Sequence, residues 1–374
     1  FVTGSGDVYT PGLPNAVGPD RKPLVEEKAA NINATWEIAT KKDLGFEFSF
    51  LKNDMFVLTM DFYDEFRDGI LLSRKSVPVY AGTEPKKMNI GKTRTRGYEI
   101  ELKFQYATPD GDWYVFAKPS ISFSDNRIIS KDEPEYTPAY QKEEGYRIGQ
   151  LFGYHHSGWI NNADAAMSAA RYGSGLMGLG DTEYIDFNGD GIIDSNDIYK
   201  LGYAQTYPLY NYALSLGFSY RNFDFSVMFQ AVIHITRTVV DNFAWPLHRL
   251  SNQVFDYQLD SWRPDNTDAA YPSYHFDNNR VHNNIGDGNV RSTAAYDASY
   301  LRLKNISISY NFSRKLVSRI GLSSARLYLR GNNIFTFAPN YPLADPEASD
   351  GGANVTNGYY PMTRTVTFGF QIGF

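Results

Sequence analysis

The stretch Arg364-Thr-Val-Thr-Phe-Gly-Phe-Gln-Ile-Gly-Phe374 decides the fold class of this sequence. Its Val, Phe and Ile residues fall on one side of a period-two pattern, and its Thr, Gly and Gln residues fall on the other. This alternation predicts a β-strand with one apolar face and one small, polar face. A soluble sandwich could show it too, but sandwich strands usually have about five or six residues. A tilted strand that crosses a bilayer needs about 9–11 residues, so the stretch favours a transmembrane β-barrel.

The composition is consistent with a barrel and excludes two other classes of protein. Tyr and Phe are frequent in the 374 residues (28 and 25), and Cys is absent. No apolar run approaches the roughly 18 residues of a transmembrane helix, which excludes a helical membrane protein. The net charge of −6 provides no basic surface, so we expect no nucleic-acid partner.

Further alternating segments predict more strands of the same kind. The apolar parity slips between Leu303 and Ile306, which predicts a β-bulge. Together the segments predict about ten strands. The segments besides the terminal one are residues 45–50, 56–63, 98–106, 113–125, 214–220, 223–229, 300–310 and 325–337.

The connections between these segments alternate between short and long. Short ones lie near residues 53, 110, 221 and 317, and long ones lie near residues 82, 165, 268 and 350. Outer-membrane barrels have short periplasmic turns and long extracellular loops, whereas a sandwich has no reason to sort its loops in this way. We therefore predict an all-β, antiparallel transmembrane barrel in the bacterial outer membrane, with its C-terminus in the periplasm.

Several motifs, in order from about residue 30 to the end, resemble the C-terminal half of the SusC/RagA-like TonB-dependent transporters of Bacteroidetes. Each motif is weak alone, and the resemblance rests on the set. The motifs are Asn89-Ile-Gly-Lys92, Gly97-Tyr-Glu-Ile-Glu-Leu102, Gly153-Tyr154 through Gly158, Asp186 through Asp197, Tyr220-Arg-Asn-Phe-Asp-Phe225, Ser299-Tyr-Leu-Arg-Leu-Lys-Asn305, Gly331-Asn-Asn-Ile-Phe-Thr-Phe337, Asp345-Pro-Glu347 and the tail to Phe374.

The resemblance implies a barrel of about 22 strands with an N-terminal plug in its lumen. It also implies a TonB-box segment, a SusD-like surface lipoprotein over the barrel, and a dimer of transporter–lipoprotein pairs. Residues 1–374 would be the C-terminal part of the barrel, without plug or TonB box. The sequence begins at Phe1 with no initiator Met or signal peptide, so we expect a piece of a longer protein. The rest of the barrel and the plug would come from another fragment of that protein.

The function that follows is active import of a large nutrient, an oligosaccharide or an oligopeptide, driven by TonB. The long segments 127–206 and 239–298 would contact the lipoprotein, and the strands would contact outer-membrane lipid. The alternative is a passive porin or a surface adhesin, since long loops suit either. A porin would be a complete smaller barrel without a plug.

The sequence gives no support for an enzyme. His155 and His156 are adjacent, which on a strand would place them on opposite faces. The run Gly173-Ser-Gly-Leu-Met-Gly178 matches a dinucleotide pattern but lacks the flanking strand and helix that this motif needs. We predict no catalytic residue.

Four loop aromatics, Tyr154, Trp159, Trp245 and Trp262, are candidates for substrate contact. Their rings could stack on a sugar or hold a peptide. The simpler interpretation is that they pack the loops or lie at the lipid interface, as barrel aromatics commonly do.

The run Asp186 to Asp197 has the spacing of an EF-hand-like calcium loop. Such a loop places oxygen ligands at positions 1, 3, 5, 7, 9 and 12, with Gly at position 6. Asp stands at position 12, where an EF-hand has Glu, and an acidic surface turn is the alternative interpretation. We predict one structural Ca²⁺ ion held by Asp186, Asn188, Asp190, the carbonyl of Ile192, Asp194 and Asp197.

Overall fold

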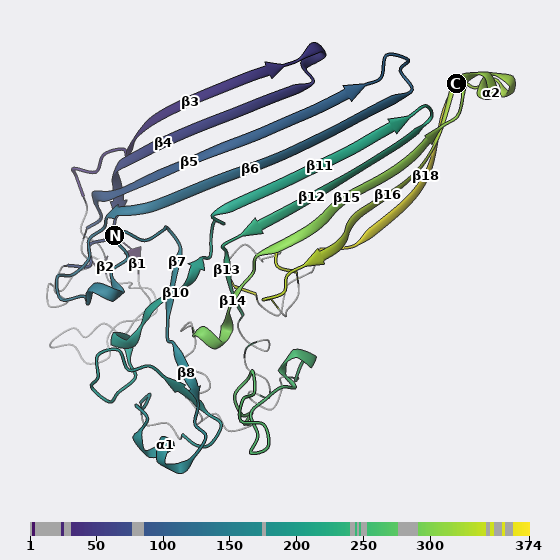
Figure 1. The fold of residues 1–374 in the computed structure, drawn as a ribbon. Helices are drawn as coiled ribbons and strands as arrows, with labels where there is room; N and C mark the ends of the chain where they lie inside the picture. Colours follow the sequence, from purple (N-terminus) through teal and green to yellow (C-terminus); the bar gives the residue numbers. More distant parts are fainter. Residues whose placement is uncertain are drawn as a thin grey trace.

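The protein is an antiparallel β-sheet with a folded body of loops at one end, as seen in a computed structural model (Figure 1). No helix among the described residues is long and apolar enough to span a membrane. The structure describes residues 2–3, 24–25, 31–76, 86–173, 177–239, 244, 247, 253–275, 291–341, 345–347, 354–355 and 362–374.

The main sheet has nine strands in the order β18-β16-β15-β12-β11-β6-β5-β4-β3. We predicted about ten strands from the sequence, and the structure has nine in this sheet. The eight connections located in the sequence also join nine strands, so the predicted number was one too high. Every neighbouring pair is antiparallel, and β3 and β18 form the two edges, so the described sheet is open. The strands are β3 (Ile38–Phe50), β4 (Phe56–Leu72), β5 (Met88–Ala107), β6 (Trp113–Ser130), β11 (Tyr210–Tyr220), β12 (Phe223–Ile233), β15 (Tyr300–Asn311), β16 (Ser324–Phe337) and β18 (Thr365–Gly373).

Cross-strand pairing carries one apolar face through the whole sheet. Phe225 pairs with Ile308, Ile308 with Leu329, and Leu329 with Phe368, and directly paired residues lie on the same side. We call this the outer face. On the opposite, inner face Glu101 pairs with Thr59 and Ser120, and Gln371 with Arg326. The predicted alternation therefore extends over all nine strands.

Tight turns and several β-bulges or register shifts set the register of the sheet. The short connections contain Asn53, Gly111 and Arg221, all with positive φ. The pairing of β15 with β16 shifts between Leu303 and Asn305, which confirms the predicted bulge. Two short helices, α2 (Arg314–Val317) and η9 (Ser318–Ile320), form the remaining short connection, at the same end of the sheet as the C-terminus (Figure 1).

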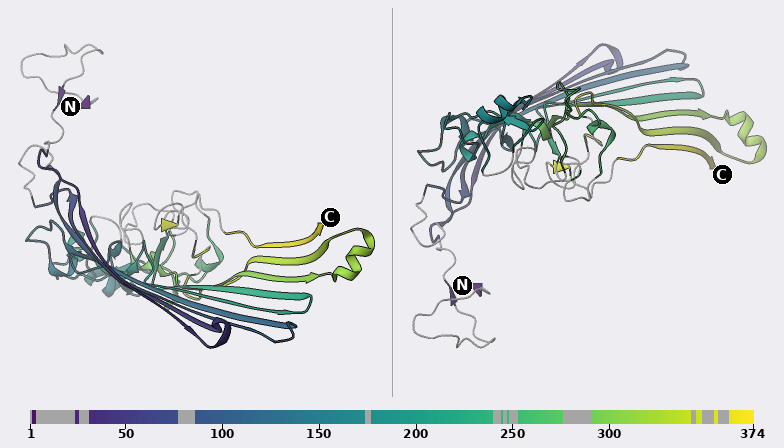
Figure 2. Two further views of the ribbon diagram at one scale, coloured as in Figure 1. Left: turned by 90° about the horizontal axis from the view of Figure 1, so that it is seen from above. Right: turned by 90° about the horizontal axis from the view of Figure 1, so that it is seen from below.

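Aromatic rings cover glycines on the inner face. The ring of Tyr328 lies over Gly369 of the adjacent strand, where a Cβ would collide with it. Phe116 covers Gly217 in the same way. Glycines of this kind let a sheet curve, and the ring replaces the missing side chain. Figure 2 shows the result, a curved sheet with the loop segments on its concave side.

The long connections form what we call the loop body, the described parts of residues 131–209, 234–275, 291–299 and 338–347. The loop body has its own core, which includes Val232, Ile235 and Tyr300 at its junction with the sheet. The remaining described elements, most of them in this body, are β1 (Val2–Thr3), β2 (Leu24–Val25), η1 (Lys52–Asp54), η3 (Ala139–Gln141), β7 (Gln150–Gly153), β8 (His156–Trp159), α1 (Ala163–Ser168), β9 (Thr182–Tyr184), η4 (Ser195–Asp197), β10 (Tyr199–Ala204), β13 (Thr236–Val239), η7 (Asp256–Gln258), η8 (Ser292–Ala294), β14 (Ala295–Asp297) and β17 (Asn354–Val355).

Candidate functional site

The acidic loop Asp186–Asp197 curls around its own first carboxylate. Asp186 Oδ1 accepts a hydrogen bond from Gly189 N at 2.6 Å, and Oδ2 accepts one from Gly191 N at 2.7 Å. Both glycines have positive φ, which the sharp turn requires. Asp190 Oδ1 accepts from Ile192 N at 2.8 Å. The loop therefore has the tight turn that the EF-hand-like spacing predicts.

Asp197 closes the loop from its other end. Its side chain is buried, and its two oxygens accept hydrogen bonds from Phe187 N and Asp194 N, at 2.8 and 2.9 Å. Ile193 anchors the loop by packing against Tyr154 and Tyr184. The backbone also pairs with Arg171, whose carbonyl accepts from Ile193 N at 2.9 Å. These contacts fix both the ends and the middle of the loop.

The carboxylates of the acidic loop point at backbone N–H groups. Within the described part of the chain, no three His, Cys, Asp or Glu side chains are grouped so that they could hold a metal ion. A carboxylate oxygen that accepts one N–H keeps a lone pair for a cation. The ligand types fit calcium, since all six are oxygens. Asp190 Oδ2 accepts a hydrogen bond from Asn188 Nδ2 at 2.8 Å, and Asp194 Oδ1 accepts one from Asn196 N at 2.7 Å.

The predicted substrate aromatics lie mostly inside the loop body. Tyr154 is 3% exposed and Trp262 is 7% exposed, so neither ring presents a face to a ligand. Trp262 Nε1 donates to Asn161 Oδ1 at 2.7 Å, and Trp159 Nε1 donates to the Ala269 carbonyl at 2.7 Å. These bonds correspond to the simpler interpretation, packing of the loops. Trp245 lies outside the described residues.

Burial also changes the pKa of the two tyrosine side chains that pack against the acidic loop. It raises the pKa of Tyr154 and Tyr184 to about 12. Both phenols are therefore protonated at neutral pH and act as neutral packing groups.

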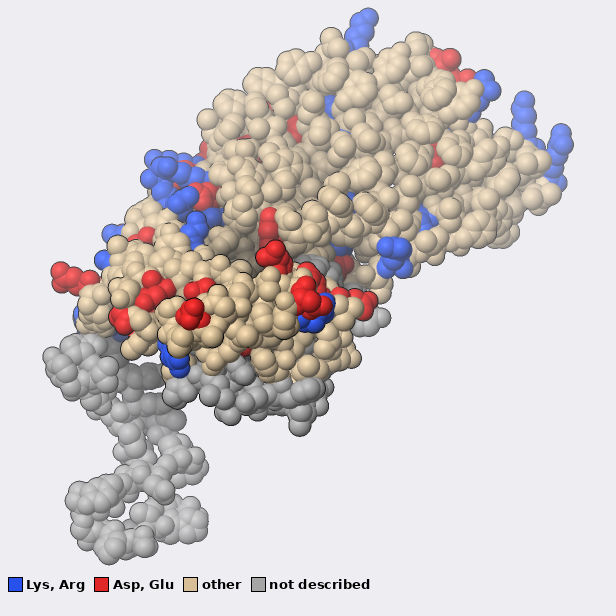
Figure 3. Space-filling view, turned by 60° about the horizontal axis from the view of Figure 1, so that its bottom comes forward, with Lys and Arg blue, Asp and Glu red and all other residues tan. Residues whose placement is uncertain are grey.

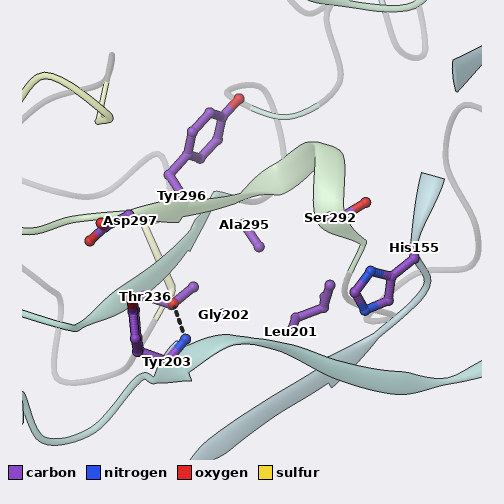
Figure 4. Close-up of a pocket in the computed structure, with 9 residues that line it drawn as sticks. All are labelled: His155, Leu201, Gly202, Tyr203, Thr236, Ser292, Ala295, Tyr296 and Asp297. Atoms are coloured by element: carbon purple, nitrogen blue, oxygen red, sulfur yellow. Dashed lines mark hydrogen bonds between the residues drawn. The ribbon is translucent and has the colours of Figure 1, made fainter. Parts of the chain in front are cut away.

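A small cavity of about 180 Å³ lies where four separate segments of the loop body meet. Figure 4 shows that β10 supplies Leu201 and Tyr203, and that the side chains of Tyr296 and Asp297 point away from the other residues drawn. Thr236 Oγ1 accepts a hydrogen bond from Tyr203 N at 2.7 Å across one wall. Pockets for drug-sized ligands usually have about 300–1,000 Å³, so this cavity has room for one small group and not for an oligomer. It is lined by His155, Leu201, Gly202, Tyr203, Thr236, Ser292, Ala295, Tyr296 and Asp297.

Only one cavity residue, His155, lies in a motif that the sequence singled out. His155 Nε2 donates to the Lys200 carbonyl at 2.9 Å, and His156 Nδ1 lies 2.6 Å from Ser292 Oγ. Each imidazole ring therefore has its own hydrogen-bond partner, the Lys200 carbonyl for His155 and the Ser292 hydroxyl for His156. The other cavity residues have no shared motif, and only the tertiary fold brings their segments together.

A buried ion cluster joins the loop body to the inner face of the sheet. Arg302 on β15 is 0% exposed, and its Nη1 donates to Glu347 Oε2 at 2.7 Å while its Nη2 donates to Asp345. Lys304 Nζ donates to Glu347 Oε1 at 2.6 Å. The cluster links the Ser299–Asn305 and Asp345–Glu347 motifs, which the sequence noted separately. It holds the segment 345–347 against the inner face.

No protein-family model matches the chain, but individual proteins do. The chain is similar to TonB-dependent receptor P3 of Formosa agariphila, with 27% identity over 92% of this chain and 35% of that receptor. It is also similar to TonB-dependent receptor SusC of Bacteroides thetaiotaomicron, with 25% identity over 93% of this chain and 33% of SusC. The chain thus spans about a third of the length of the curated relatives it matches.

The fold matches a solved structure of the RagAB peptide importer in its open-open state. The TM-score is 0.72 at 20% identity, and the match covers 96% of this chain and 37% of the other. The nine-stranded sheet and its loop body therefore have the fold of part of that importer's barrel.

Proposed function

Because the chain belongs to the SusC/RagA-like family of TonB-dependent receptors, of which it spans a C-terminal portion, we propose that the complete protein actively imports a large nutrient. Receptors of this family are transporters and not enzymes, and they reside in the bacterial outer membrane. The nutrient class is an oligosaccharide or an oligopeptide, and TonB supplies the energy. A SusD-like lipoprotein covers the outer opening.

The observation that carries this proposal is the contrast between the two faces of the sheet. The outer face is apolar from β3 to β18, whereas the inner face carries polar groups such as Glu101 and Gln371 and the buried ion cluster. Such a wall separates lipid from a polar lumen. The loop body lies on the concave side, where a lumen would be (Figure 2).

The open edges of the sheet support a longer protein. In lipid, the unpaired backbone groups of β3 and β18 would each cost several kcal/mol. We therefore propose that further strands of the same protein pair with both edges and that a plug fills the lumen. This chain would then be the C-terminal part of the barrel throughout, residues 1–374.

The test is uptake by the full-length receptor in its native membrane. Mass spectrometry of the purified native complex should identify an oligomeric nutrient and a lipoprotein partner. Uptake should stop when the TonB box is deleted or the proton gradient is dissipated. Uptake that persists in both conditions, with an open ion-conducting pore, would instead identify a passive porin.

We also propose that the acidic loop Asp186–Asp197 binds one Ca²⁺ ion that fixes the shape of this part of the loop body. The ligand spacing supports it, and so does the turn around Asp186. Oxygen ligands should lie at about 2.3–2.6 Å from the ion. A helix pair, which a calcium sensor would need, does not flank the loop among the described residues. The proposed role is therefore structural.

Limited proteolysis with calcium or a chelator tests this site. Asp190→Ala should abolish calcium protection of residues 181–200 and leave the sheet intact. Asp164→Ala, in α1 of the same loop body but outside the acidic loop, is the matched control and should retain protection. A well-ordered loop in millimolar calcium with only water among the carboxylates would refute the site.

A further inference from the structure

The apolar outer face ends in a row of aromatic rings on the side of the loop body. Phe62, Tyr98, Phe123 and Tyr210 pair with one another across four strands. The rings of Tyr98 and Phe123 lie 5.2 Å apart, and those of Phe123 and Tyr210 lie 5.1 Å apart. Aromatic rows of this kind mark the interface between lipid and water.

The opposite end of the outer face has a second aromatic group, which includes Trp113 and Tyr220 at 4.3 Å. Tyr210 and Tyr220 bound the outer face of β11. At about 3.4 Å per residue and a tilt of about 40°, the distance between them along the membrane normal is about 26 Å. This equals the height of the apolar band of an outer-membrane barrel, about 25 Å.

Charged residues begin directly beyond the aromatic row. In the next row of the outer face Lys42 pairs with Asp64, Asp64 with Arg96, and Arg96 with Asp125. The row after that pairs Arg94 with Arg127. We call these six residues the basic belt. Figure 3 shows charged side chains gathered at the two ends of a broad uncharged surface.

The basic belt has more positive than negative charge. Its four cations face two carboxylates, so two positive charges remain. Asp64 is held by Arg94, at 2.8 Å from Nε to Oδ1. Asp125 is shared by Arg127 at 2.7 Å and by Arg147 of the loop body at 3.4 Å. Both carboxylates of the basic belt therefore already form ion pairs with arginines.

Two features leave room for an anion. Arg96 is 61% exposed and its nearest carboxylate is 3.7 Å away, so its donors are available. Lys42, in the same row, forms no ion pair with another described residue, whereas Arg94 and Arg127 are held by Asp64 and Asp125. Guanidinium groups match phosphate oxygens in two-point geometry.

We propose that the basic belt binds the phosphate groups of a phosphorylated glycolipid in the outer leaflet. The belt lies at headgroup depth, because it follows the aromatic row, and it lies on the face that continues the lipid-facing band. A ligand bound there would have its acyl chains on the apolar face and its phosphates on Arg96 and Lys42. This inference rests on the outer-membrane orientation of the proposed function and on no property of the transported nutrient.

Native mass spectrometry of the full-length receptor, titrated with lipid A in detergent, tests the proposal. The double variant Lys42→Gln/Arg96→Gln removes two cations that no close ion pair holds. A basic residue near a lipid headgroup contributes a factor of about five, so the loss of two should weaken lipid A retention about 25-fold. Lys103→Gln, on the inner face of the same strand as Arg96, is the matched control and should retain lipid A like the wild type.

Three ligands separate the possible outcomes. Phosphorylated lipid A should be retained, and dephosphorylated lipid A and inorganic phosphate should not. Equal retention of the dephosphorylated lipid, retention of inorganic phosphate alone, or equal loss in the Lys103→Gln control would overturn the proposal. Heat-modified gel mobility of each variant confirms that the barrel has folded. Because the readout is lipid retention, a receptor that fails to transport can still support the belt, and a transporting receptor can still refute it.

Discussion

The sheet and the loop body place their residues in opposite ways. The sheet exposes its large apolar side chains, and Phe368 of β18 is 71% exposed. The loop body buries polar ones, including Asp181, Thr182 and Asp197. Long backbone ladders hold the sheet, whereas short strand pairs, small apolar clusters and side-chain hydrogen bonds hold the loop body. The sheet therefore has the exposed apolar surface that the proposed contact with lipid requires, and the loop body buries its polar groups with hydrogen-bond partners, as proteins in water do.

The largest expected effect is at the ion cluster where the two regions meet. Arg302→Met removes the cation between Asp345 and Glu347, and breaking a buried pair in this way costs about 3–5 kcal/mol. The loss should appear as faster hydrogen exchange in peptides that include residues 345–347, with unchanged exchange in β11. Arg330→Met is the control and should cost at most about 1 kcal/mol, because among the described residues the Arg330 guanidinium contacts the Tyr328 ring and forms no ion pair. Equal exchange in the two variants would show that the cluster does not hold the segment.

A second prediction compares adjacent residues on the two faces of β12. Val227 lies at mid-height on the outer face, and Ser226 lies beside Gly217 and Ser307 on the inner face. Val227→Arg should destabilise the receptor by about 2–4 kcal/mol in guanidinium unfolding from lipid vesicles, because it places a charge in hydrocarbon. Ser226→Arg should lower the free energy of unfolding far less, because it places the charge on the polar inner face. If Ser226→Arg destabilised the receptor more than Val227→Arg, the lipid would contact the face that we call inner.

The aromatic-covered glycines give a smaller effect. Gly369→Val should displace the Tyr328 ring and destabilise the sheet by about 1–3 kcal/mol, as overpacking does. Thr367→Val, two residues earlier on the same face of β18, adds no such clash. If the two variants have the same free energy of unfolding, the ring does not stabilise the curvature.

Much of the sheet could be predicted from sequence because the face on which a residue lies follows from its position in the alternation along its own strand. Alternation alone placed Phe368 and Gln371 on opposite faces and located the bulge near Leu303. The strands proved longer than the alternation indicated: β5 begins at Met88, not near Tyr98, because its first half carries Arg and Thr in place of apolar residues. Charged residues outside the bilayer can extend a strand without leaving a hydrophobic pattern.

The loop body could not be predicted in the same way because its contacts are between distant segments. The acidic loop was visible as a motif, since its ligands lie within one short run. The cavity joins residues from His155 to Asp297, and no local pattern connects them. The partner of the buried Trp262 indole is Asn161, which is far away in sequence.

The central claim is that the outer face meets lipid and the inner face meets water. Residues 1–374 contain no Cys, so a single cysteine introduced among them can carry a spin label in the full-length receptor in a bilayer, and the receptor without the introduced cysteine gives the background signal. Labels at Phe368, Phe370 and Phe374 should collide with oxygen dissolved in lipid, and labels at Thr367, Gln371 and Glu101 should collide with a water-soluble nickel chelate. The reverse pattern, or access of the chelate to all six positions, would contradict the account.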